Sequence, residues 1–551
     1  MSDESFDYVI VGGGSAGCVL ASRLSEDRTS RVLLLEAGIA DRSPMFRIPV
    51  GTMRIGGKYD WQYPGEPDPS RGGQSFVWPA GKVLGGGSSV NAMFWCRGNR
   101  ADFDSWAASG CDGWAYDDVL PYFKRAETFD GGADEYRGGD GPQHVSRLRV
   151  AHPLTDVFVQ AAEELGLARN PDYNGAFQEG VSYAQYSQRN GLRDSTSGAY
   201  LSRARWRRNL VVRTGATARR VVFDGTRATG VEYERRGRVA TVSAGSEVIL
   251  ACGALASPKL LMLSGVGPAN QLREHGIPVL VDRPEVGENL QEHAYAPMMY
   301  GVTVATLNVE VTPKALVKHG LDFAVRRRGP VTSGGVHAVV FDRLDGDAAQ
   351  PQIEILFAPF GVSSSTEEEE AGGSFSHDVH AMKLKAVASV TAYPSVAHPA
   401  GRGAVRLRSA DPADPPVIDF QMLGDAADLA TLMAGVRRVR ELFRTNALAP
   451  YVASEMVPGP GVEDDEALEA FLRGASFGGN HPVGTCRMGG DDEAVLDTEL
   501  RVRGTAGLRV VDGAAIPLVI TGHTNAPIVM LAEKAADLIK LDRLAAFVRR
   551  R

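Results

Sequence analysis

Three glycines near the start of the chain have the spacing of a phosphate-binding turn. Gly12, Gly14 and Gly17 form the pattern Gly-x-Gly-x-x-Gly. The first glycine permits a tight turn, the second lets the backbone approach a pyrophosphate, and the third lets a helix pack closely on a strand. The N–H groups at the start of such a helix are unpaired and attract phosphate. The residues of this turn predicted to contact a dinucleotide are Gly12, Gly14, Ser15, Ala16 and Gly17.

The elements that would position this turn follow one another in order. The β-branched and aromatic run 6–11 predicts a buried strand, 18–24 continues with helical spacing, and 31–35 predicts a second buried strand that ends at Glu36. Glu36 is placed to accept hydrogen bonds from ribose hydroxyl groups. These features predict a βαβ dinucleotide-binding unit, for which an ordinary glycine turn is the alternative. FAD and NAD both stay open, because an acid at this position suits the adenosine ribose of either.

Composition limits the class of protein. The chain has 551 residues, of which 44% are hydrophobic and 23% charged, as in folded soluble proteins with more than one domain. A net charge of −8 and a pI of 5.8 predict no general attraction to nucleic acid or to anionic lipid. The five cysteines are scattered, and the sequence has no long apolar run and no signal peptide. We therefore expect a cytoplasmic protein with no metal site and no transmembrane segment.

Two longer stretches resemble the signature sequences of the glucose-methanol-choline (GMC) oxidoreductases. They are 81–91 (GKVLGGGSSVN) and 253–267 (GALASPKLLMLSGVG). Further stretches typical of the family are Asp60-Trp61, 286–290 (VGENL), 481–489 (HPVGTCRMG) and the closing segment 521–539. The resemblance spans the chain and is strongest to the choline-dehydrogenase-like and aryl-alcohol-oxidase-like branches. It implies FAD as the cofactor rather than NAD.

The same resemblance implies two domains. One is an α/β Rossmann-like FAD-binding domain, and the other is an α+β substrate domain built on an antiparallel sheet. We expect 1–155, 196–300 and 466–551 in the first domain, and 156–195 and 301–465 in the second. Apolar or alternating runs at 352–360, 383–393 and 404–407 suit the antiparallel sheet. The segment 363–374 contains four consecutive glutamates and is expected to be a surface insertion, with a lid as the alternative.

Further residues are placed against FAD by the resemblance. A glycine-serine turn such as 85–91 can wrap phosphate and ribityl oxygens with its backbone N–H groups. Where some relatives carry a histidine joined covalently to the flavin, this chain has Val90, so FAD is expected to bind noncovalently. The additional cofactor contacts predicted in this way are Trp61, Val83, Gly86, Ser89, Asn91, Ala218, Asp512, Gly513, Asn525 and Ala526.

Two of the 11 histidines stand in stretches to which the resemblance assigns the chemistry. His481 begins the 481–489 stretch at the reactive edge of the flavin. His523 lies 14 residues before Asp537, where the family carries its second catalytic residue, and Asn525 is its rival for that role. The other histidines stand in ordinary contexts, and His377 and His380 lack a third metal ligand. The residues considered for the substrate side are Asn480, Phe357, Trp95 and Phe94.

The chemistry explains the use of a histidine pair. An alcohol must lose a hydroxyl proton and a carbon-bound hydride, and its alkoxide is the better hydride donor. One imidazole can take the proton while the second holds the oxygen. The sequence therefore predicts oxidation of a neutral primary alcohol to the aldehyde by hydride transfer to flavin N5, with reoxidation by oxygen, a quinone or another acceptor.

Three alternatives stay beside this prediction. Choline is the alternative substrate, although no cage for its cation can be placed in the sequence. A hydroxynitrile lyase or a photodecarboxylase-like enzyme would use the same fold without oxidising an alcohol. The two histidines favour the oxidation.

Overall fold

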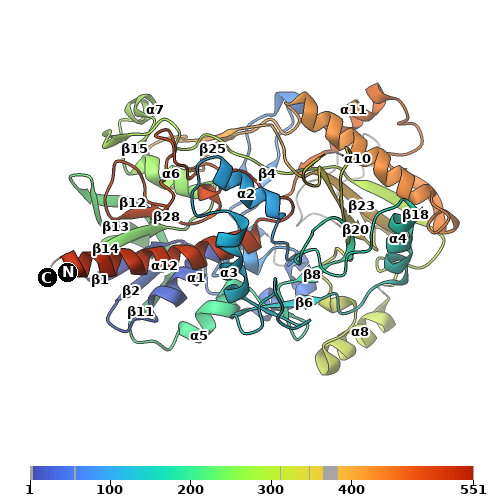
Figure 1. The fold of residues 1–551 in the computed structure, drawn as a ribbon, viewed down its shortest axis with the longest axis horizontal. Coiled ribbons are helices and arrows are strands. Elements are labelled where there is room, and N and C mark those ends of the chain that lie inside the picture. The colour runs from blue at the N-terminus through green and yellow to red at the C-terminus, as the bar shows by residue number, and fades with distance from the viewer. Residues whose placement is uncertain (1–3, 55–56, 311, 347, 364–382, 550–551) are drawn as a thin grey trace.

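The fold is that of a computed structural model, which describes residues 4–54, 57–310, 312–346, 348–363 and 383–549. Two large sheets dominate it, and they lie towards opposite ends of the molecule (Figure 1). The expected segment 363–374 lies outside the described residues except for Ser363, and His377 and His380 lie outside them too. No helix in the described ranges is long and apolar enough to cross a membrane.

The first sheet has seven strands and contains the glycine motif. Its order is β11-β2-β1-β14-β13-β12, and β28 pairs with β14. The strands are β1 (Ser5–Val11), β2 (Val32–Glu36), β11 (Leu210–Thr214), β12 (Ala216–Asp224), β13 (Arg227–Arg235), β14 (Arg238–Leu250) and β28 (Leu508–Val510). β1 pairs in parallel with β2 and β14. Helices α1 (Ser15–Leu24) and α12 (Asn525–Arg549) pack together, and in Figure 1 they run side by side beside this sheet. The apolar runs of β1 and β2 are therefore buried, as the sequence predicts for parallel strands.

The second sheet has eight strands and is antiparallel. Its order is β26-β18-β23-β20-β19-β7, with β17 and β27 attached beside β23. The strands are β7 (Gly180–Tyr183), β17 (Ala294–Tyr295), β18 (Met298–Val302), β19 (Ala338–Asp342), β20 (Ile353–Ala358), β23 (Ser389–Val396), β26 (Val452–Val457) and β27 (Phe477–Gly478). Helices α4 (Pro153–Glu164) and α10 (Ala426–Arg444) share a buried apolar cluster with it. The predicted fold class, a Rossmann-like α/β part with an antiparallel α+β part, is confirmed.

Some predicted strands differ in detail. The run 383–393 is not one strand, because β22 (Lys383–Leu384) pairs with β21 (Val362–Ser363) and only β23 joins the large sheet. The run 404–407 forms β24 (Ala404–Arg406), which pairs with β25 (Val417–Asp419) in a sheet of its own. β17 and part of β18 precede the expected boundary at residue 301, and β27 follows the one at 466. The domain limits stay a prediction. These strands of the second sheet would extend the substrate domain beyond both limits.

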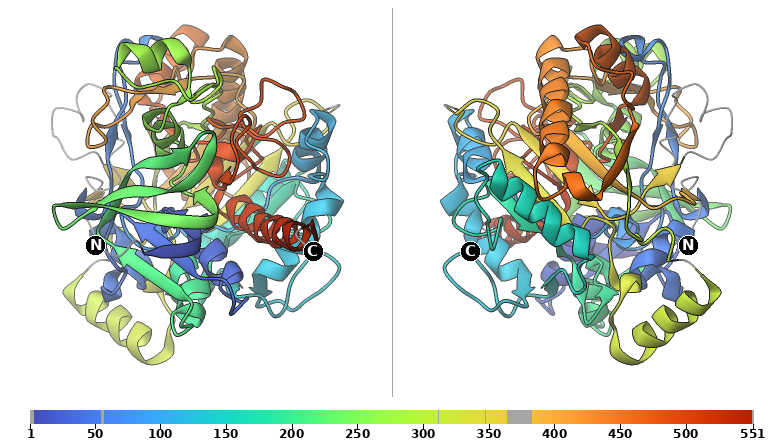
Figure 2. Two further views of the ribbon diagram at one scale, coloured as in Figure 1. Left: turned by 90° about the vertical axis from the view of Figure 1, so that its left-hand side faces the viewer. Right: turned by 90° about the vertical axis from the view of Figure 1, so that its right-hand side faces the viewer.

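Shorter elements connect the two sheets. Helix α8 (Pro313–Arg326), yellow-green in Figure 2, projects at the lower edge of the molecule, away from both sheets. The remaining helices are α2 (Arg100–Ala108), α3 (Tyr116–Ala126), α5 (Ser202–Ala204), α6 (Ala256–Leu263), α7 (Ala269–Glu274), α8 (Pro313–Arg326) and α11 (Asp465–Ala475). The remaining short strands are β3 (Tyr63–Pro64), β4 (Val77–Trp78), β5 (Glu127–Phe129), β6 (Gln143–Arg147), β8 (Gln185–Tyr186), β9 (Gln188–Arg189), β10 (Leu192–Arg193), β15 (Val266–Gly267) and β16 (Val281–Asp282).

Candidate active site

One large cavity is lined by residues from both sheets. Its volume is about 1610 Å³, and its walls include the glycine turn, the end of β2, the start of α12 and residues of β23. Pockets for small ligands usually measure roughly 300 to 1,000 Å³. This cavity therefore has room for a dinucleotide and a second small molecule.

The glycine turn has the geometry that its spacing predicts. Gly12 has φ +101°, and a Cβ atom there would lie 2.3 Å from the carbonyl oxygen of Ala251. A Cβ atom on Gly17 would lie 1.9 Å from the carbonyl oxygen of Gly12, so only glycine lets α1 pack this closely. At Gly14 a Cβ atom would meet no protein atom closer than 3.8 Å, and Gly14 lines the cavity. Its exposed backbone leaves space for a phosphate at the start of α1.

Glu36 ends β2 at the cavity wall. Its Oε2 accepts a hydrogen bond from the Gly13 N–H at 2.7 Å, and its Oε1 accepts one from the Gly38 N–H at 2.6 Å. Burial raises the pKa of this carboxyl group to about 7, although the two amide donors act in the opposite direction. Glu36 thus fixes the glycine turn, a role that the sequence did not reveal. Its predicted contact with ribose stays a prediction.

Two polar side chains tie the carboxyl-terminal segment to the glycine-rich regions. Oδ2 of Asp512 accepts hydrogen bonds from the Gly253 N–H at 2.8 Å and from the Ser257 hydroxyl at 2.6 Å. Nδ2 of Asn525 donates to Oγ of Ser15 at 2.8 Å. Asn525 therefore faces the dinucleotide turn at the start of α12, which supports the cofactor side over the catalytic role for which it was the rival.

Most of the predicted cofactor contacts line the cavity, but some lie behind its wall. The lining residues are Gly12, Gly14, Ser15, Ala16, Glu36, Trp61, Gly86, Asn91, Ala218, Asp512, Gly513 and Asn525. Gly17, Val83, Ser89 and Ala526 are absent from the lining. Val83, Ser89 and Ala526 are almost fully buried, and the Ser89 hydroxyl donates to the Leu84 carbonyl at 2.7 Å. These four residues lie behind the residues that line the cavity.

The two predicted catalytic histidines lie together at the cavity. The ring centroids of His481 and His523 are 4.5 Å apart, with 63° between the ring planes. His481 lies in the loop after β27, and His523 lies in the loop just before α12. These two loops bring the rings together. Burial lowers the pKa of His481 well below its usual value, and the neighbouring His523 and His293 act in the same direction. His481 is therefore a neutral imidazole at neutral pH.

A third histidine, His293, sets the proton position on His481. Its Nε2 lies 3.0 Å from the Ala397 carbonyl oxygen, which can only accept, so Nε2 carries the hydrogen. Burial lowers the pKa of His293 to about 4, so the neutral ring has a bare Nδ1. That atom lies 2.9 Å from Nδ1 of His481, which must then donate. His481 is left with an unprotonated Nε2, the atom that a general base needs.

Buried carboxyl groups hold the two loops that carry His481 and His523. Glu292 accepts hydrogen bonds from the His481 N–H at 2.8 Å and from the His293 N–H at 2.9 Å. Burial raises its pKa to about 8 against the effect of these amide donors. On the other side, Oε1 of Glu354 lies 3.4 Å from Nε2 of His523, and its Oε2 accepts from the Tyr295 hydroxyl at 2.7 Å.

Glu354 gives the His523 side of the pair a negative charge. Burial acts to raise the pKa of Glu354, but the His523 charge and the hydrogen bonds of His523 and Tyr295 hold it below its usual value. Nε2 of His523 faces this carboxylate, which can only accept a hydrogen bond. His523 also lines the cavity, where an imidazole N–H can donate a hydrogen bond to an oxygen on which negative charge develops. His293 and Glu354 are the functional candidates that the sequence analysis missed.

The substrate-side predictions divide into two groups. Asn480 and Phe94 line the cavity, and the Phe94 ring centroid lies 4.5 Å from that of His523. Phe357 and Trp95 do not line it, so both expectations are corrected. Phe357 is buried against Phe158, with ring centroids 4.4 Å apart. Trp95 is buried and its Nε1 donates to Glu127 at 3.2 Å.

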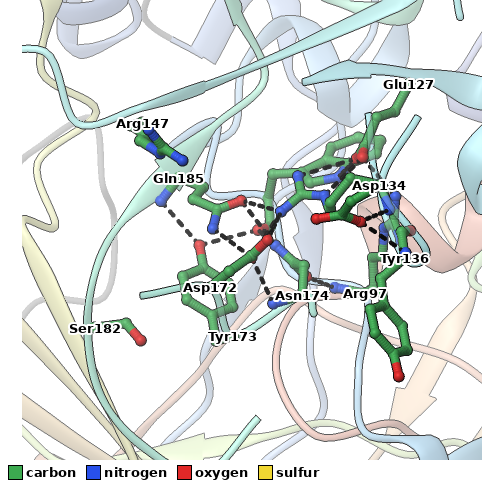
Figure 3. Close-up of polar contacts among 12 residues, drawn as sticks. Arg97, Glu127, Asp134, Tyr136, Arg147, Asp172, Tyr173, Asn174, Ser182 and Gln185 are labelled. Atoms are coloured by element: carbon green, nitrogen blue, oxygen red, sulfur yellow. Dashed lines mark hydrogen bonds and ion pairs between the residues drawn. The ribbon is translucent and has the colours of Figure 1, made fainter. Parts of the chain in front are cut away.

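A buried ion cluster supports the wall that Phe94 forms. Figure 3 shows Arg97 and Glu127 in this cluster, together with Asp172, Tyr173 and Asn174. Arg97 pairs with Glu127 at 2.6 Å, and the Tyr173 hydroxyl donates to the Trp95 carbonyl at 3.0 Å. The Tyr173 ring stacks on Phe94 at 5.6 Å. The cluster therefore fixes the backbone that follows Phe94.

The cavity fits the FAD that the sequence predicts. Its volume, the glycine cradle and the exposed start of α1 suit an adenine dinucleotide, and the histidine pair lies farther along the same cavity. Val90 lines the cavity and has no nucleophilic atom. We expect acid precipitation of the holoprotein to release all of its FAD into the supernatant, as measured by absorbance. Yellow colour that stays in the washed pellet would contradict noncovalent binding.

Comparisons with known proteins identify the family of the chain. The two family models described as GMC oxidoreductase match residues 6–295 and 399–532. The chain is 39% identical over 539 residues to the oxygen-dependent choline dehydrogenase of Brucella anthropi, covering 97% of this chain and 95% of the relative.

Two solved structures share the fold. A pyridoxine 4-oxidase from Mesorbium loti is 31% identical with a TM-score of 0.86, covering 97% of this chain and 98% of that one. A fungal aryl-alcohol oxidase is 27% identical with a TM-score of 0.83, covering 99% and 100%. The chain therefore belongs to the GMC oxidoreductase family and is an FAD-binding enzyme that oxidises alcohols.

Proposed function

We propose that this enzyme oxidises a neutral primary alcohol to the aldehyde, with His481 as the general base and His523 as the hydrogen-bond donor to the substrate oxygen. The observation that carries the proposal is the hydrogen-bond chain from the Ala397 carbonyl through His293 to His481, which leaves Nε2 of His481 free to take a proton. The aldehyde oxygen and carbon both come from the alcohol, which loses one proton and one hydride.

The residues of the chain act in a definite order. Nε2 of His481 takes the hydroxyl proton of the alcohol. His523, beside the Glu354 carboxylate, donates a hydrogen bond to the alkoxide and keeps it in place. When bound, FAD supplies the flavin ring that accepts the hydride from the alcohol carbon. The names of the relatives, which include an oxygen-dependent dehydrogenase and oxidases, support oxygen as the final acceptor, with a quinone or another acceptor as the alternative.

The surroundings of the histidine pair favour a neutral substrate. Phe94, Phe360 and Tyr393 line the cavity, and Phe94 contacts His523. The carboxyl groups of Glu354 and Glu292 lie beside His523 and His481. Oε2 of Glu354 accepts from the Tyr295 hydroxyl, its Oε1 faces Nε2 of His523, and Glu292 accepts from backbone N–H groups, so both carboxyl groups face donors of the protein itself. An aromatic or allylic alcohol suits this wall, because its π-system also stabilises charge at the carbon that loses hydride.

Choline is the second candidate substrate, because the Brucella relative is a choline dehydrogenase. We expect benzyl alcohol to reduce the flavin faster than choline at equal concentration. Stopped-flow mixing under argon, followed by flavin absorbance, measures both rates. Faster bleaching by choline would transfer the proposal to a cationic substrate and leave the base and donor roles intact.

The role of His293 predicts a graded response to substitution. His293→Leu removes the acceptor for the His481 Nδ1–H and should slow flavin reduction roughly 10- to 100-fold, the range for groups that orient a functional imidazole. His293→Asn is the matched control, because its Oδ1 lies near the position of the histidine Nδ1 and can accept the same hydrogen bond. Reduction rates at saturating alcohol, with FAD content measured in parallel, test this. Equal rates in the two variants would contradict the orienting role.

A further inference from the structure

Helix α8 carries apolar side chains on its exposed side. Leu316, Val317, Leu321 and Val325 are 53%, 64%, 60% and 78% exposed. Single exposed apolar residues are ordinary, but Val317, Leu321 and Val325 are spaced about one turn apart on this helix of 14 residues and form a continuous apolar face. Figures 1 and 2 show α8 as a separate rod at the lower edge of the molecule, where its outer side faces away from both sheets.

The helix is held to the protein through its other side. Phe323 is buried, with only 8% of its surface exposed, and His319 and Asp322 are partly buried on the same side. The Arg327 guanidinium lies 5.0 Å from the centre of the Phe323 ring at the end of the helix. An α-helix turns 100° per residue, so Val317, Leu321 and Val325 lie on the face of α8 opposite these buried residues. Because α8 packs on the protein through Phe323 and its neighbours, its apolar face points to solvent.

The charge on α8 differs from that of the rest of the chain. Between 313 and 328 the sequence has five cations and one carboxylate, whereas the whole chain has a net charge of −8. The cations are Lys314, Lys318, Arg326, Arg327 and Arg328. Asp322 pairs with Arg326 at 3.3 Å, which leaves the other four without that neutralising partner. Helix α8 is therefore basic, although the chain as a whole is acidic.

We propose that α8 is a docking surface for an anionic lipid bilayer. A helix with exposed apolar residues flanked by lysine and arginine lies in the interface of a membrane, with the apolar face among the acyl chains and the cations at the headgroups. Each cation near an anionic leaflet strengthens binding about fivefold. A second copy of the chain fits this face less well, because a symmetric contact would bring two sets of these cations together.

Docking would also orient the cavity. Leu316 and His319 line it from α8, and Leu316 is more than half exposed, so α8 forms part of the cavity rim. The bilayer would then lie beside the entrance. Binding through α8 goes beyond the proposed alcohol oxidation and does not depend on it, since no residue of α8 contacts the histidine pair among the described contacts.

Vesicle co-sedimentation of the holoprotein tests the proposal. The probes are phosphatidylcholine vesicles with and without phosphatidylglycerol, at low and high salt. We expect binding to the anionic vesicles that weakens with salt and little binding to the neutral ones. The double variant Leu321→Ser/Val325→Ser should lose most of this binding, at least tenfold, while keeping its FAD. Lys314→Ser/Lys318→Ser should weaken binding to anionic vesicles more than tenfold.

A matched control lies at the other end of the molecule. Leu541 and Leu544 of α12 are 61% and 62% exposed beside Arg543, and in Figure 1 the end of α12 lies on the opposite side from α8. Leu541→Ser/Leu544→Ser should bind vesicles like the wild type. The proposal is overturned by an absence of vesicle binding, or by equal binding of the α8 variants. It is also overturned if sedimentation velocity shows that wild type self-associates and the α8 variants do not, since the face is then a contact between copies.

Discussion

Replacing His481 with alanine should leave FAD bound and slow flavin reduction by roughly 10²- to 10⁴-fold, the usual contribution of a general base. The hydroxyl proton then has no acceptor at the position of Nε2, so hydride must leave from the alcohol instead of the alkoxide. Stopped-flow reduction under argon gives the rate, and the flavin absorbance of the purified variant gives the FAD content. His144→Ala is the control, because His144 pairs with Asp194 at 3.0 Å and does not line the cavity.

The pH dependence of the same rate follows from the lowered pKa of His481. The base must be unprotonated, so the rate falls only when acid protonates it. Because burial and the neighbouring histidines lower its pKa well below the usual value, the wild-type rate should be level from neutral pH upward. Near-normal reduction in His481→Ala would refute its role as the base.

Replacing His523 with alanine should slow flavin reduction by roughly 10²- to 10³-fold, as expected for loss of one donor to a developing oxyanion. Asn525→Ala should have a smaller effect on this rate, because its Nδ2 is bound to Ser15 at the dinucleotide turn. Its main effect is expected on FAD affinity. Both quantities come from one set of samples, by stopped flow and by titration of the apoprotein with FAD. The opposite ranking of rates would transfer the donor role to Asn525.

The sequence predicted the parts of the site that depend on local pattern. The glycine turn needs only neighbouring residues, so Gly12, Gly14 and Gly17 could be placed with their strand and helix. The antiparallel sheet was predicted from apolar runs, although 383–393 proved to be two strands. His481 and His523 came from stretches with a family resemblance, and the structure places their rings 4.5 Å apart.

The missed and corrected residues depend on side-chain direction and on long-range contacts. β20 is buried along its whole length, so its pattern does not show which residues face the cavity side. Glu354 approaches His523, whereas Phe357, three positions on, points to the opposite face of the strand. Phe94 and Trp95 are also neighbours that point in different directions: Phe94 lines the cavity, whereas Trp95 is buried away from it. His293 acquires its role only because the chain brings it to His481, 188 positions away.

The central claim is that the bound flavin oxidises an alcohol without light, with the histidine pair removing the hydroxyl proton. The most direct measurement mixes the holoenzyme with benzyl alcohol under argon in the dark, and records flavin bleaching together with the aldehyde produced. We predict complete bleaching with one aldehyde formed per flavin reduced. A flavin that stays oxidised with a whole panel of alcohols, or that reacts only under illumination, would contradict the claim and favour a lyase or a photodecarboxylase-like enzyme.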